Sequence, residues 1–272
     1  MSMYISTNVS SLNAQRNLAN SSKSLDTSYT RLASGLRINS AKDDAAGLQI
    51  SSRMTSQING LDQGNRNAND GISMAQTAEG AMDEVTSMLQ RMRTLAQQSA
   101  NDTNSDDDRA ALQKEVVALQ EEITRIGSDT TFAGTNLFAA DKTYDFQVGA
   151  DANQIISVDL KAMSAATLGV DAYDISDKTG AQTALADIDD VIKEVDGYRA
   201  DLGAVQNRLD STIRNQSNIS ENVSAARSRI RDADFATETA NMTKQNILQQ
   251  AASSILAQAN QRPQSALSLL GR

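Results

Sequence analysis

Residues 58–96 read INGLDQGNRNANDGISMAQTAEGAMDEVTSMLQRMRTLA. Small or apolar residues recur there in alternating steps of three and four, in two runs separated by a small shift of phase. The first run is Ile58, Leu61, Asn65, Ala68, Ile72 and Ala75, and the second is Ala78, Met82, Val85, Leu89, Met92 and Ala96. This spacing is typical of a helix that packs along its length against other helices. It predicts one helix of about 50 residues, roughly 75–80 Å long at 1.5 Å per residue.

The same spacing predicts further long helices on both sides of this one. Their apolar stripes are Ile5, Val9 and Leu12; Leu18, Leu25, Tyr29, Leu32 and Leu36; Leu112, Val116, Leu119, Ile123 and Ile126; Val195 to Ile230; and Met242, Leu248, Ala252, Ile255 and Ala259. The chain has a single proline, Pro263, and we expect it to end or kink the last helix because it lacks an N–H donor. Near-absence of proline permits very long helices elsewhere.

Between residues 127 and 180 the period changes. Tyr144, Phe146 and Val148 alternate with polar residues, and Ile156, Val158 and Leu160 alternate on the far side of a Gly149–Asn153 turn. Alternation of this kind predicts a β-hairpin, near residues 137–160. We expect residues 161–180 to be irregular and polar.

The fold class that follows is mainly α. Long antiparallel, coiled-coil-like helices would form a rod with a small β-hairpin region, and the N- and C-terminal helices would pair. Slender helices bury only part of an apolar stripe within one subunit. The stripes on residues 1–36 and 235–270 therefore predict an external partner, and their Ala-rich, weakly charged surfaces suit packing between copies of the chain.

Composition excludes several functional classes. Histidine, cysteine and tryptophan are all absent, so the chain has no Ser-His-Asp triad, thiolate nucleophile or Cys/His metal site. Asp106, Asp107 and Asp108 suggest a metal site at first sight, but helix capping and first-turn acids are the favoured interpretation. We expect no enzyme activity, no cofactor and no metal.

Charge and hydropathy argue against nucleic acid and membrane as partners. The net charge is −9, and the middle of the chain carries −14 while the two ends are slightly basic. Such a surface argues against nucleic-acid binding. No apolar run is long enough to span a membrane, and the first 20 residues lack the apolar region of a cleavable Sec signal.

Several stretches resemble bacterial flagellin, in the order in which that family carries them. Near the N-terminus they are ISTNVSSLNAQ (5–15), RLASGLRINSAKDDAAGL (31–48), RNANDGIS (66–73) and QTAEGAM (76–82); near the C-terminus they are LGAVQNR (202–208), SRIRDADF (228–235) and QANQRPQ (258–264). The resemblance covers the whole chain. It is to a short form, because large flagellins carry variable outer domains where this chain has only residues 161–180.

The resemblance implies an architecture and a function. Residues 1–44 and 233–272 would pair as the inner, filament-core domain, and residues 45–232 would form the rod domain. Residues 34–46 would be the connecting spoke. The subunit would polymerise into the flagellar filament, the propeller for swimming, as an extracellular protein secreted by type III export. Its partners would be copies of itself, an export chaperone on the C-terminal region, and the filament cap and hook-junction proteins.

Two sets of residues follow from the resemblance. The expected apolar contacts of the polymer core are Ile5, Leu12, Leu25, Leu32, Leu248, Ile255 and Leu267, with packing inside the subunit as the alternative. Arg91, Leu95 and Glu115 match the contact positions for the flagellin-sensing Toll-like receptor of animal hosts. Thr94 departs from the acidic residue common there, and a solvated helix face is the alternative.

Three other functions fit the sequence less well than that of a filament subunit. A hook–filament junction adaptor shares the terminal helices, but its resemblance is looser over residues 66–80 and at the C-terminal motif. A metalloprotease of the kind some flagellins carry needs His-Glu-x-x-His, and the chain has no histidine. A chemoreceptor-type helical rod lacks membrane anchoring here.

Overall fold

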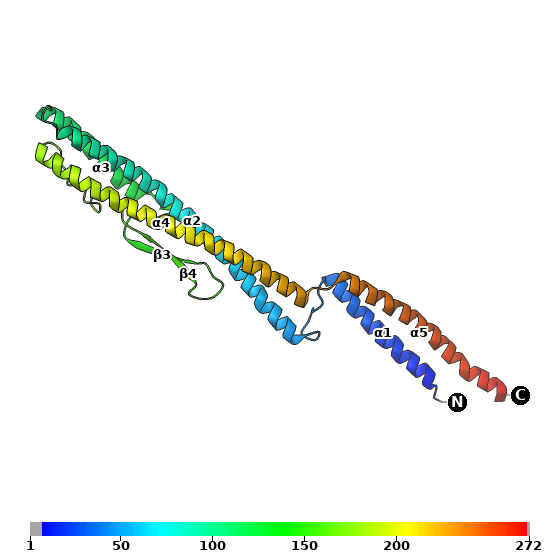
Figure 1. Ribbon diagram of the computed structural model, residues 1–272. Helices are drawn as coiled ribbons and strands as arrows, with labels where there is room; N and C mark the ends of the chain where they lie inside the picture. Colours follow the sequence, from blue (N-terminus) through cyan, green and yellow to red (C-terminus); the bar gives the residue numbers. More distant parts are fainter. Residues whose placement is uncertain (1–6, 271–272) are drawn as a thin grey trace. The chain divides into compact units, whose positions relative to one another are not determined.

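The computed structural model describes the backbone of residues 7–270 and the side-chain surroundings of residues 7–261. It divides into two compact units, and each is described by itself. The terminal unit comprises residues 1–56 and 222–272, and the central unit comprises residues 57–221. Two long helices, α2 (Ala45–Ser99) and α4 (Lys178–Arg231), contribute residues to both units (Figure 1).

The terminal unit is built on the pairing of α1 (Val9–Ser34) with α5 (Phe235–Leu270). The two helices are antiparallel, because a residue near the start of α1 contacts the end of α5 and a residue near the end of α1 contacts its start. Ser11 Oγ lies 2.8 Å from Asn260 Oδ1, and Ser28 Oγ lies 2.6 Å from Glu238 Oε1. Gly35 ends α1 at a φ of 70°, in the left-handed region that glycine adopts without strain. The predicted pairing of the terminal helices is confirmed.

Helix α5 continues through Pro263 to Leu270, so of the two expected effects of this proline, an end or a kink of the helix, the first is wrong. Proline has no N–H to donate to the carbonyl four residues earlier, which belongs to Ala259. That carbonyl instead accepts a hydrogen bond of 2.7 Å from Asn8 Nδ2. A side chain of the opposite helix thus satisfies the acceptor that the proline leaves open.

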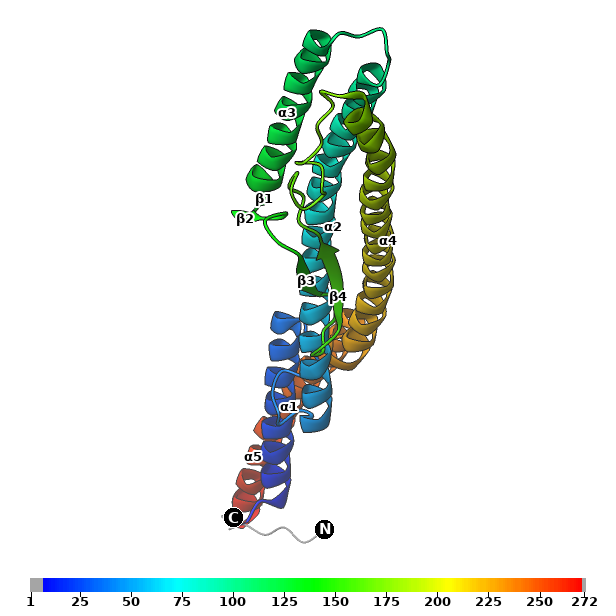
Figure 2. The same ribbon diagram turned by 90° about the vertical axis from the view of Figure 1, so that its left-hand side faces the viewer.

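In the central unit α2 and α4 run antiparallel, side by side (Figure 2). The hydrogen bonds and ion pairs between them join later residues of α2 to earlier residues of α4. They are Asp62 with Ser220, Glu79 with Gln206, Asp83 with Arg199, and Arg93 with Asp189. Helix α3 (Asp106–Asp129) packs beside α2, and its buried Val116 and Ile123 join the same core as Met82 and Leu89. The stripe identified in residues 58–96 is therefore the central seam of this core.

The start of α3 confirms the capping interpretation of the acidic triplet. The Ser105 hydroxyl accepts from the Asp108 amide, and the Asp108 carboxylate accepts from the Ser105 amide at 3.0 Å. This reciprocal arrangement satisfies two backbone donors of the first turn. The Ser105 hydroxyl also donates to the Asp108 carboxylate at 2.7 Å, and this hydrogen bond, followed by the one from the Ser105 amide, lowers the pKa of Asp108.

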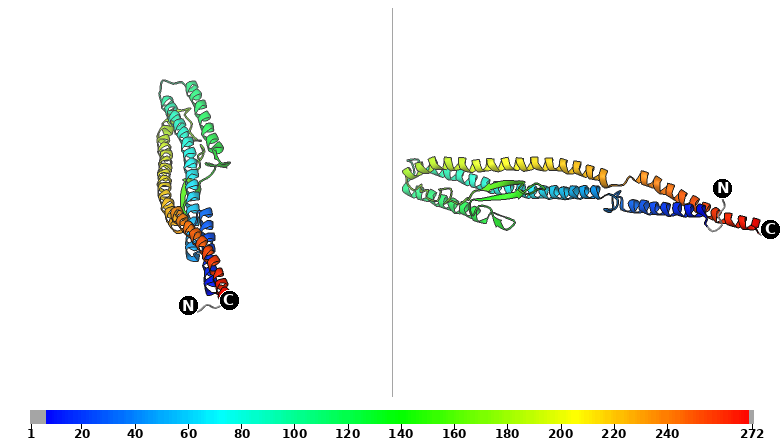
Figure 3. Two further views of the ribbon diagram at one scale, coloured as in Figure 1. Left: turned by 90° about the vertical axis from the view of Figure 1, so that its right-hand side faces the viewer. Right: turned by 90° about the horizontal axis from the view of Figure 1, so that it is seen from below.

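The predicted hairpin is present. Strands β3 (Lys142–Gln147) and β4 (Ile155–Leu160) pair antiparallel, with Tyr144 opposite Val158 and Phe146 opposite Ile156 (Figure 3). A second, smaller hairpin escaped the sequence analysis: β1 (Thr131–Phe132) pairs with β2 (Thr135–Asn136) across Ala133 and Gly134, which both have positive φ. Strands of two residues are too short to show an alternation.

Residues 161–177 are irregular, as expected, but they are not the polar segment that was predicted. Met163, Ala165, Leu168, Val170 and Ile175 are all buried in the central core. Glutamines of α3 hold their backbone, since Gln120 donates to the Val170 carbonyl at 2.6 Å and Gln113 accepts from the Ile175 amide at 2.8 Å. The spacing of the five buried residues follows neither the helical nor the strand period. For that reason the sequence pattern did not predict their burial.

Glycines on one face of α2 let the β3–β4 hairpin lie close against that helix. A Cβ added at Gly60 would meet Ala150, one at Gly64 would overlap the Val148 carbonyl, and one at Gly71 would touch Phe146. Asn67, between them on α2, donates to the Gln147 carbonyl at 2.8 Å. The hairpin is thereby fixed against α2 and beside α4.

Candidate functional site

The contact between α1 and α5 is thin and mostly polar. The buried residues of α1 are Ser11, Ala14, Ser21, Leu25 and Ser28. Those of α5 within the described side chains are Glu238, Ala252 and Ala259. Leu25 is the one large apolar side chain in this set. A seam of small residues offers little apolar area, so packing alone specifies the register of the pair weakly.

Polar contacts fix that register at both ends of the pair. Glu238, only 8% exposed, accepts the Ser28 hydroxyl and lies 3.7 Å from the Arg31 guanidinium. At the other end Asn8 caps α1, because its Oδ1 accepts from the Ser11 amide at 3.1 Å while its Nδ2 donates to the Ala259 carbonyl. The contacts of Glu238 with Ser28 and Arg31, and of Asn8 with Ala259, would be lost if the helices slid by one turn.

Replacing Asn8 with alanine is expected to loosen the first turn of α1 by about 2 kcal/mol, because a helix cap and a hydrogen bond to a buried carbonyl disappear together. Hydrogen exchange of the full-length chain should then accelerate roughly 5–30-fold at the amides of residues 11–14. Asn13→Ala is the control, since that side chain is exposed on the same helix and makes no hydrogen bond within the described residues. Equal exchange in the two variants would contradict the role of Asn8.

Large apolar side chains are exposed mainly on the terminal unit. Within the described residues, eight of the ten most exposed ones belong to it: Val9, Leu12, Tyr29, Ile50, Phe235, Ile247, Leu248 and Ile255. Ile247 is 60% exposed. Seven of these eight side chains lie on α1 and α5, and Ile50 lies on α2. A concentration of exposed apolar side chains on two slender helices is typical of a surface that another protein covers.

The seven expected contact residues fall into three groups. Leu12, Leu248 and Ile255 are exposed, and the last two line a groove of about 480 Å³ between α1 and α5. Leu25 is buried within the pair, and Leu32 is half-buried. Ile5 and the side chain of Leu267 lie outside the described residues.

Five exposed side chains of this surface are not among the seven predicted contacts: Val9, Tyr29, Ile50, Phe235 and Ile247. Val9 and Tyr29 already stood in the apolar stripes of the N-terminal helix, so their periodicity was available as a signal. Phe235 and Ile247 lie off the stripe of the last helix, and their exposure became evident only from the pairing of α5 with α1.

The two chain segments that enter and leave the terminal pair are tied to each other. The Arg37 amide donates to the Arg231 carbonyl at 2.7 Å, and the Ala233 amide donates to the Gly35 carbonyl at 2.9 Å. Beside them, hydrogen bonds from the Ser40 and then the Asn39 amide lower the pKa of Asp43. A carboxylate with a lowered pKa stabilises this turn above its ordinary pKa and loses that effect as the pH falls through the lowered value.

Arg91 and Glu115 meet on the surface of the central unit. Arg91 Nε donates to Glu115 Oε1 at 2.7 Å, so a residue of α2 is linked to one of α3. Leu95 does not lie beside them on the surface: it is 1% exposed and belongs to the core. The expectation that its side chain faces a receptor is therefore corrected, because α2 packs against both α3 and α4 and buries a wider arc than one seam.

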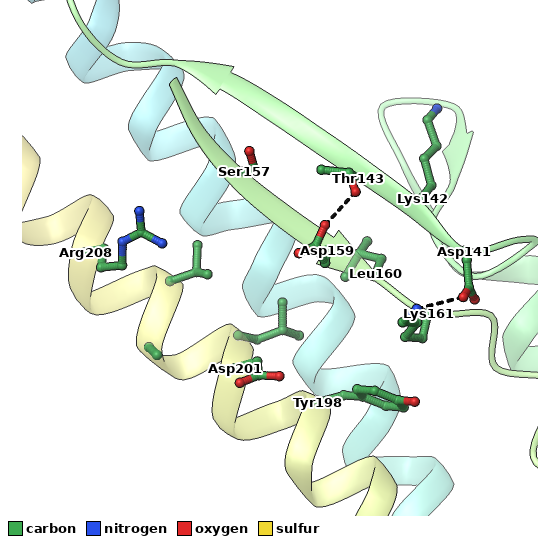
Figure 4. A pocket seen from close by; sticks show the side chains of 13 residues that line it. Asp141, Lys142, Thr143, Ser157, Asp159, Leu160, Lys161, Tyr198, Asp201 and Arg208 are labelled. Atoms are coloured by element: carbon green, nitrogen blue, oxygen red, sulfur yellow. Dashed lines mark hydrogen bonds and ion pairs between the residues drawn. The ribbon is translucent and has the colours of Figure 1, made fainter. Parts of the chain in front are cut away.

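A second groove lies between the β3–β4 hairpin and α4, with a volume of about 580 Å³ (Figure 4). Charged groups of the hairpin wall are paired within it: Lys161 lies 2.8 Å from Asp141, and Thr143 donates to Asp159 at 2.5 Å. Leu160, Leu202 and Val205 provide its apolar lining.

The described residues offer no group of three or more acidic, histidine or cysteine side chains arranged to hold a metal ion. In the same part of the chain, none of the helices has the length and apolar character needed to cross a membrane. What the surface offers is apolar and charged area for protein contacts.

Comparisons with known proteins identify relatives over the full chain. Residues 5–143 match the family model of the bacterial flagellin N-terminal helical region, and residues 185–270 match that of the C-terminal helical region. A flagellin of Halalkalibacterium halodurans is 51% identical over 272 residues, covering 98% of this chain and 100% of the relative. The polar flagellin B/D of Vibrio parahaemolyticus is 39% identical over 378 residues, with both chains covered completely.

The comparison with solved structures finds a similar fold in a flagellar protein. A putative flagellar hook-associated protein from Vibrio parahaemolyticus superposes with a TM-score of 0.60 over 70% of this chain and 100% of that one. The two sequences are 17% identical, so this likeness concerns the fold alone.

Proposed function

Given that the chain belongs to the bacterial flagellin family and is a structural subunit of the flagellar filament, we propose that α1 and α5 supply its main polymerisation contacts. The observation that carries this proposal is the concentration of exposed apolar side chains on the terminal unit. Leu12, Leu248 and Ile255 would be covered by neighbouring subunits, and Leu25 would hold the pair together from within.

Apolar burial supplies the driving force in this proposal. Removing apolar surface from water contributes about 25 cal/mol per Å², and the α1–α5 pair leaves most of its large apolar side chains exposed. In this proposal the patch that one subunit contributes to a contact differs from the patch that its neighbour contributes. Repetition of such a contact generates an open helical array rather than a closed oligomer. Order gained by the terminal helices on assembly would add to the cooperativity of growth.

The radial arrangement follows from the same reasoning. Residues 1–44 and 233–272 would form the filament core, and residues 45–232 would form the layer outside it. The apolar exposure of the terminal helices supports an inner position, and the net negative charge of the middle of the chain supports a solvated outer one.

The filament is extracellular, and we propose that the subunit is secreted to it by type III export. An export chaperone on the C-terminal region would cover the exposed side chains of α5, such as Phe235 and Ile247, before assembly. The filament cap and hook-junction proteins would contact the chain at the ends of the filament. Membership of a structural family supports a role without catalysis.

Recognition by the flagellin-sensing Toll-like receptor of animal hosts is proposed for the surface around Arg91 and Glu115. Support comes from their ion pair on the face of the central unit and from their match to the family's receptor positions. Leu95 would contribute only indirectly, by supporting α2 from the core.

Seeded polymerisation of the purified full-length chain tests the proposed function. Sheared filament fragments are added as seeds, and the product is pelleted and viewed by negative-stain electron microscopy. We expect long helical filaments, and the triple variant Leu12→Ser, Leu248→Ser, Ile255→Ser should fail to extend the seeds. A wild-type chain that stays monomeric in the presence of seeds would refute the proposal and favour an adaptor at the hook–filament junction.

A further inference from the structure

Asp201 and Arg208 stand on α4 at the groove between that helix and the β3–β4 hairpin (Figure 4). They are seven residues apart, so they lie on the same face of the helix, about 10 Å from each other along its axis. Both side chains are exposed, and neither forms an ion pair within the part of the chain that the structure describes. On the hairpin wall, in contrast, Lys161 is paired with Asp141, Asp159 accepts from the Thr143 hydroxyl, and Lys142 Nζ lies 4.6 Å from the centroid of the Tyr144 ring.

The groove is therefore a dipolar surface with an apolar lining. A carboxylate stands at one end, a guanidinium stands at the other, and Leu160, Leu202 and Val205 lie along the groove. An occupant that fits it carries a positive charge, an apolar side chain and a negative charge in that order.

Helix α3 presents this pattern on its outward face. Lys114 and Glu121 are seven residues apart on the side of α3 opposite the buried Val116 and Ile123, and Val117, three residues after Lys114, is exposed at the edge of the same face. Val117 is 40% exposed and is, with Ile155 of the hairpin, one of two exposed large apolar residues among the described residues of the central unit. Within the described residues, Lys114 and Glu121 form no ion pair. The small residues Ala110 and Ala118 flank them and allow close approach.

We propose that the groove between α4 and the β3–β4 hairpin binds the outward face of α3 from a second copy of this chain. With the two helices parallel, Lys114 of one copy meets Asp201 of the next, and Glu121 meets Arg208. Val117 then covers the apolar lining near Val205. The equal spacing of the two charge pairs, with opposite sign, is the argument for this occupant.

This contact rests on the proposed filament function and adds to it. The groove and the face of α3 belong to the same central unit but are different surfaces, so the contact between copies is heterologous and repeats without closing. It provides a second kind of subunit contact, made by charges, beside the apolar contacts of α1 and α5. It also predicts that salt weakens this part of the assembly.

Charge reversal in the full-length chain tests the contact. Arg208→Glu and Glu121→Lys, made singly, each place like charges together, and each is expected to raise the critical concentration for seeded assembly about tenfold. The double variant with both substitutions restores opposite charges and the original net charge. It should return the critical concentration to within about threefold of the wild-type value.

Arg214→Glu is the matched control, because Arg214 is exposed on the far side of the same helix and has no ion pair within the described residues. It changes the net charge as much as Arg208→Glu does, and it should leave assembly unchanged. Urea unfolding of the monomers should be the same for all variants, since the substituted side chains have no partner within the described subunit.

The outcomes separate this contact from the filament function itself. Normal assembly of Arg208→Glu, an equal defect in Arg214→Glu, or failure of the double variant to recover would each overturn the contact while leaving the filament function intact. Failure of the wild-type chain to extend seeds would overturn both.

Discussion

Replacing Gly64 with alanine is expected to destabilise the central unit by about 3 kcal/mol, through overpacking and the loss of buried hydrogen bonds. A Cβ at this position would overlap the Val148 carbonyl oxygen and carbon, and it would lie 3.1 Å from Gln216 Oε1. Backbone atoms cannot rotate away as a side chain can, so the hairpin has to move off α2.

The displacement would break contacts made by three elements. Gln216 of α4 donates to the same Val148 carbonyl, and Asn67 of α2 donates to the neighbouring Gln147 carbonyl at 2.8 Å. Both hydrogen bonds depend on the closeness that glycine allows. Urea unfolding of the full-length chain, followed by circular dichroism, measures the change in the free energy of unfolding.

Gly80→Ala is the matched control for this variant. Gly80 lies on the same helix, and an added Cβ there meets nothing within 4 Å. Alanine is favoured over glycine inside a helix by about 0.5–1 kcal/mol, so this variant should be slightly more stable than the wild type. If Gly64→Ala unfolds at the same urea concentration as Gly80→Ala, the close approach of the hairpin to α2 is refuted.

The need for glycine at this position shows what the sequence could and could not reveal. The heptad through Met82, Val85 and Leu89 identified the buried side of α2 correctly, because a helix buries a stripe whatever the identity of its neighbour. The same pattern does not say that a hairpin approaches the adjacent face at Gly64. The approach of the hairpin depends on a contact between residues far apart in the chain, and local periodicity carries no information about such contacts.

Leu95 and the segment 161–177 show the same limit. Leu95 borders the predicted stripe and looked available to a partner, but packing on two sides widened the buried arc of α2 enough to include it. Met163 and Val170 fill the core from an irregular segment whose carbonyls and amides are bonded to α3 glutamines. Buried residues in a segment without a regular period cannot be recognised from their spacing in the sequence.

The candidate assembly surface was easier to predict than its boundaries. Amphipathic spacing on both terminal helices indicated stripes in excess of what a slender pair can bury, and Leu12, Leu248 and Ile255 are indeed exposed. Leu25 lies inside the pair instead, where it is the one large apolar side chain in a seam otherwise made of serine, alanine and Glu238. Which stripe residues turn inward depends on the register, and distant polar groups such as Glu238 set that register.

Deleting residues 1–36 is expected to abolish polymerisation while leaving the central unit folded. The deletion removes α1, and with it Ser28 and Arg31, the partners that hold the buried carboxylate of Glu238. Helix α5 then exposes its remaining buried face, and an isolated helix is marginally stable in water. The core around Met82, Leu89 and Ile123 lies entirely in the central unit and keeps its contacts.

Thermal unfolding of the central unit, followed by circular dichroism, should therefore match that of the full-length chain, and seeded assembly should yield no pelletable polymer. Filaments of normal length from the shortened chain would show that α1 is dispensable, and the polymer contacts would then have to lie on α5 or on the central unit.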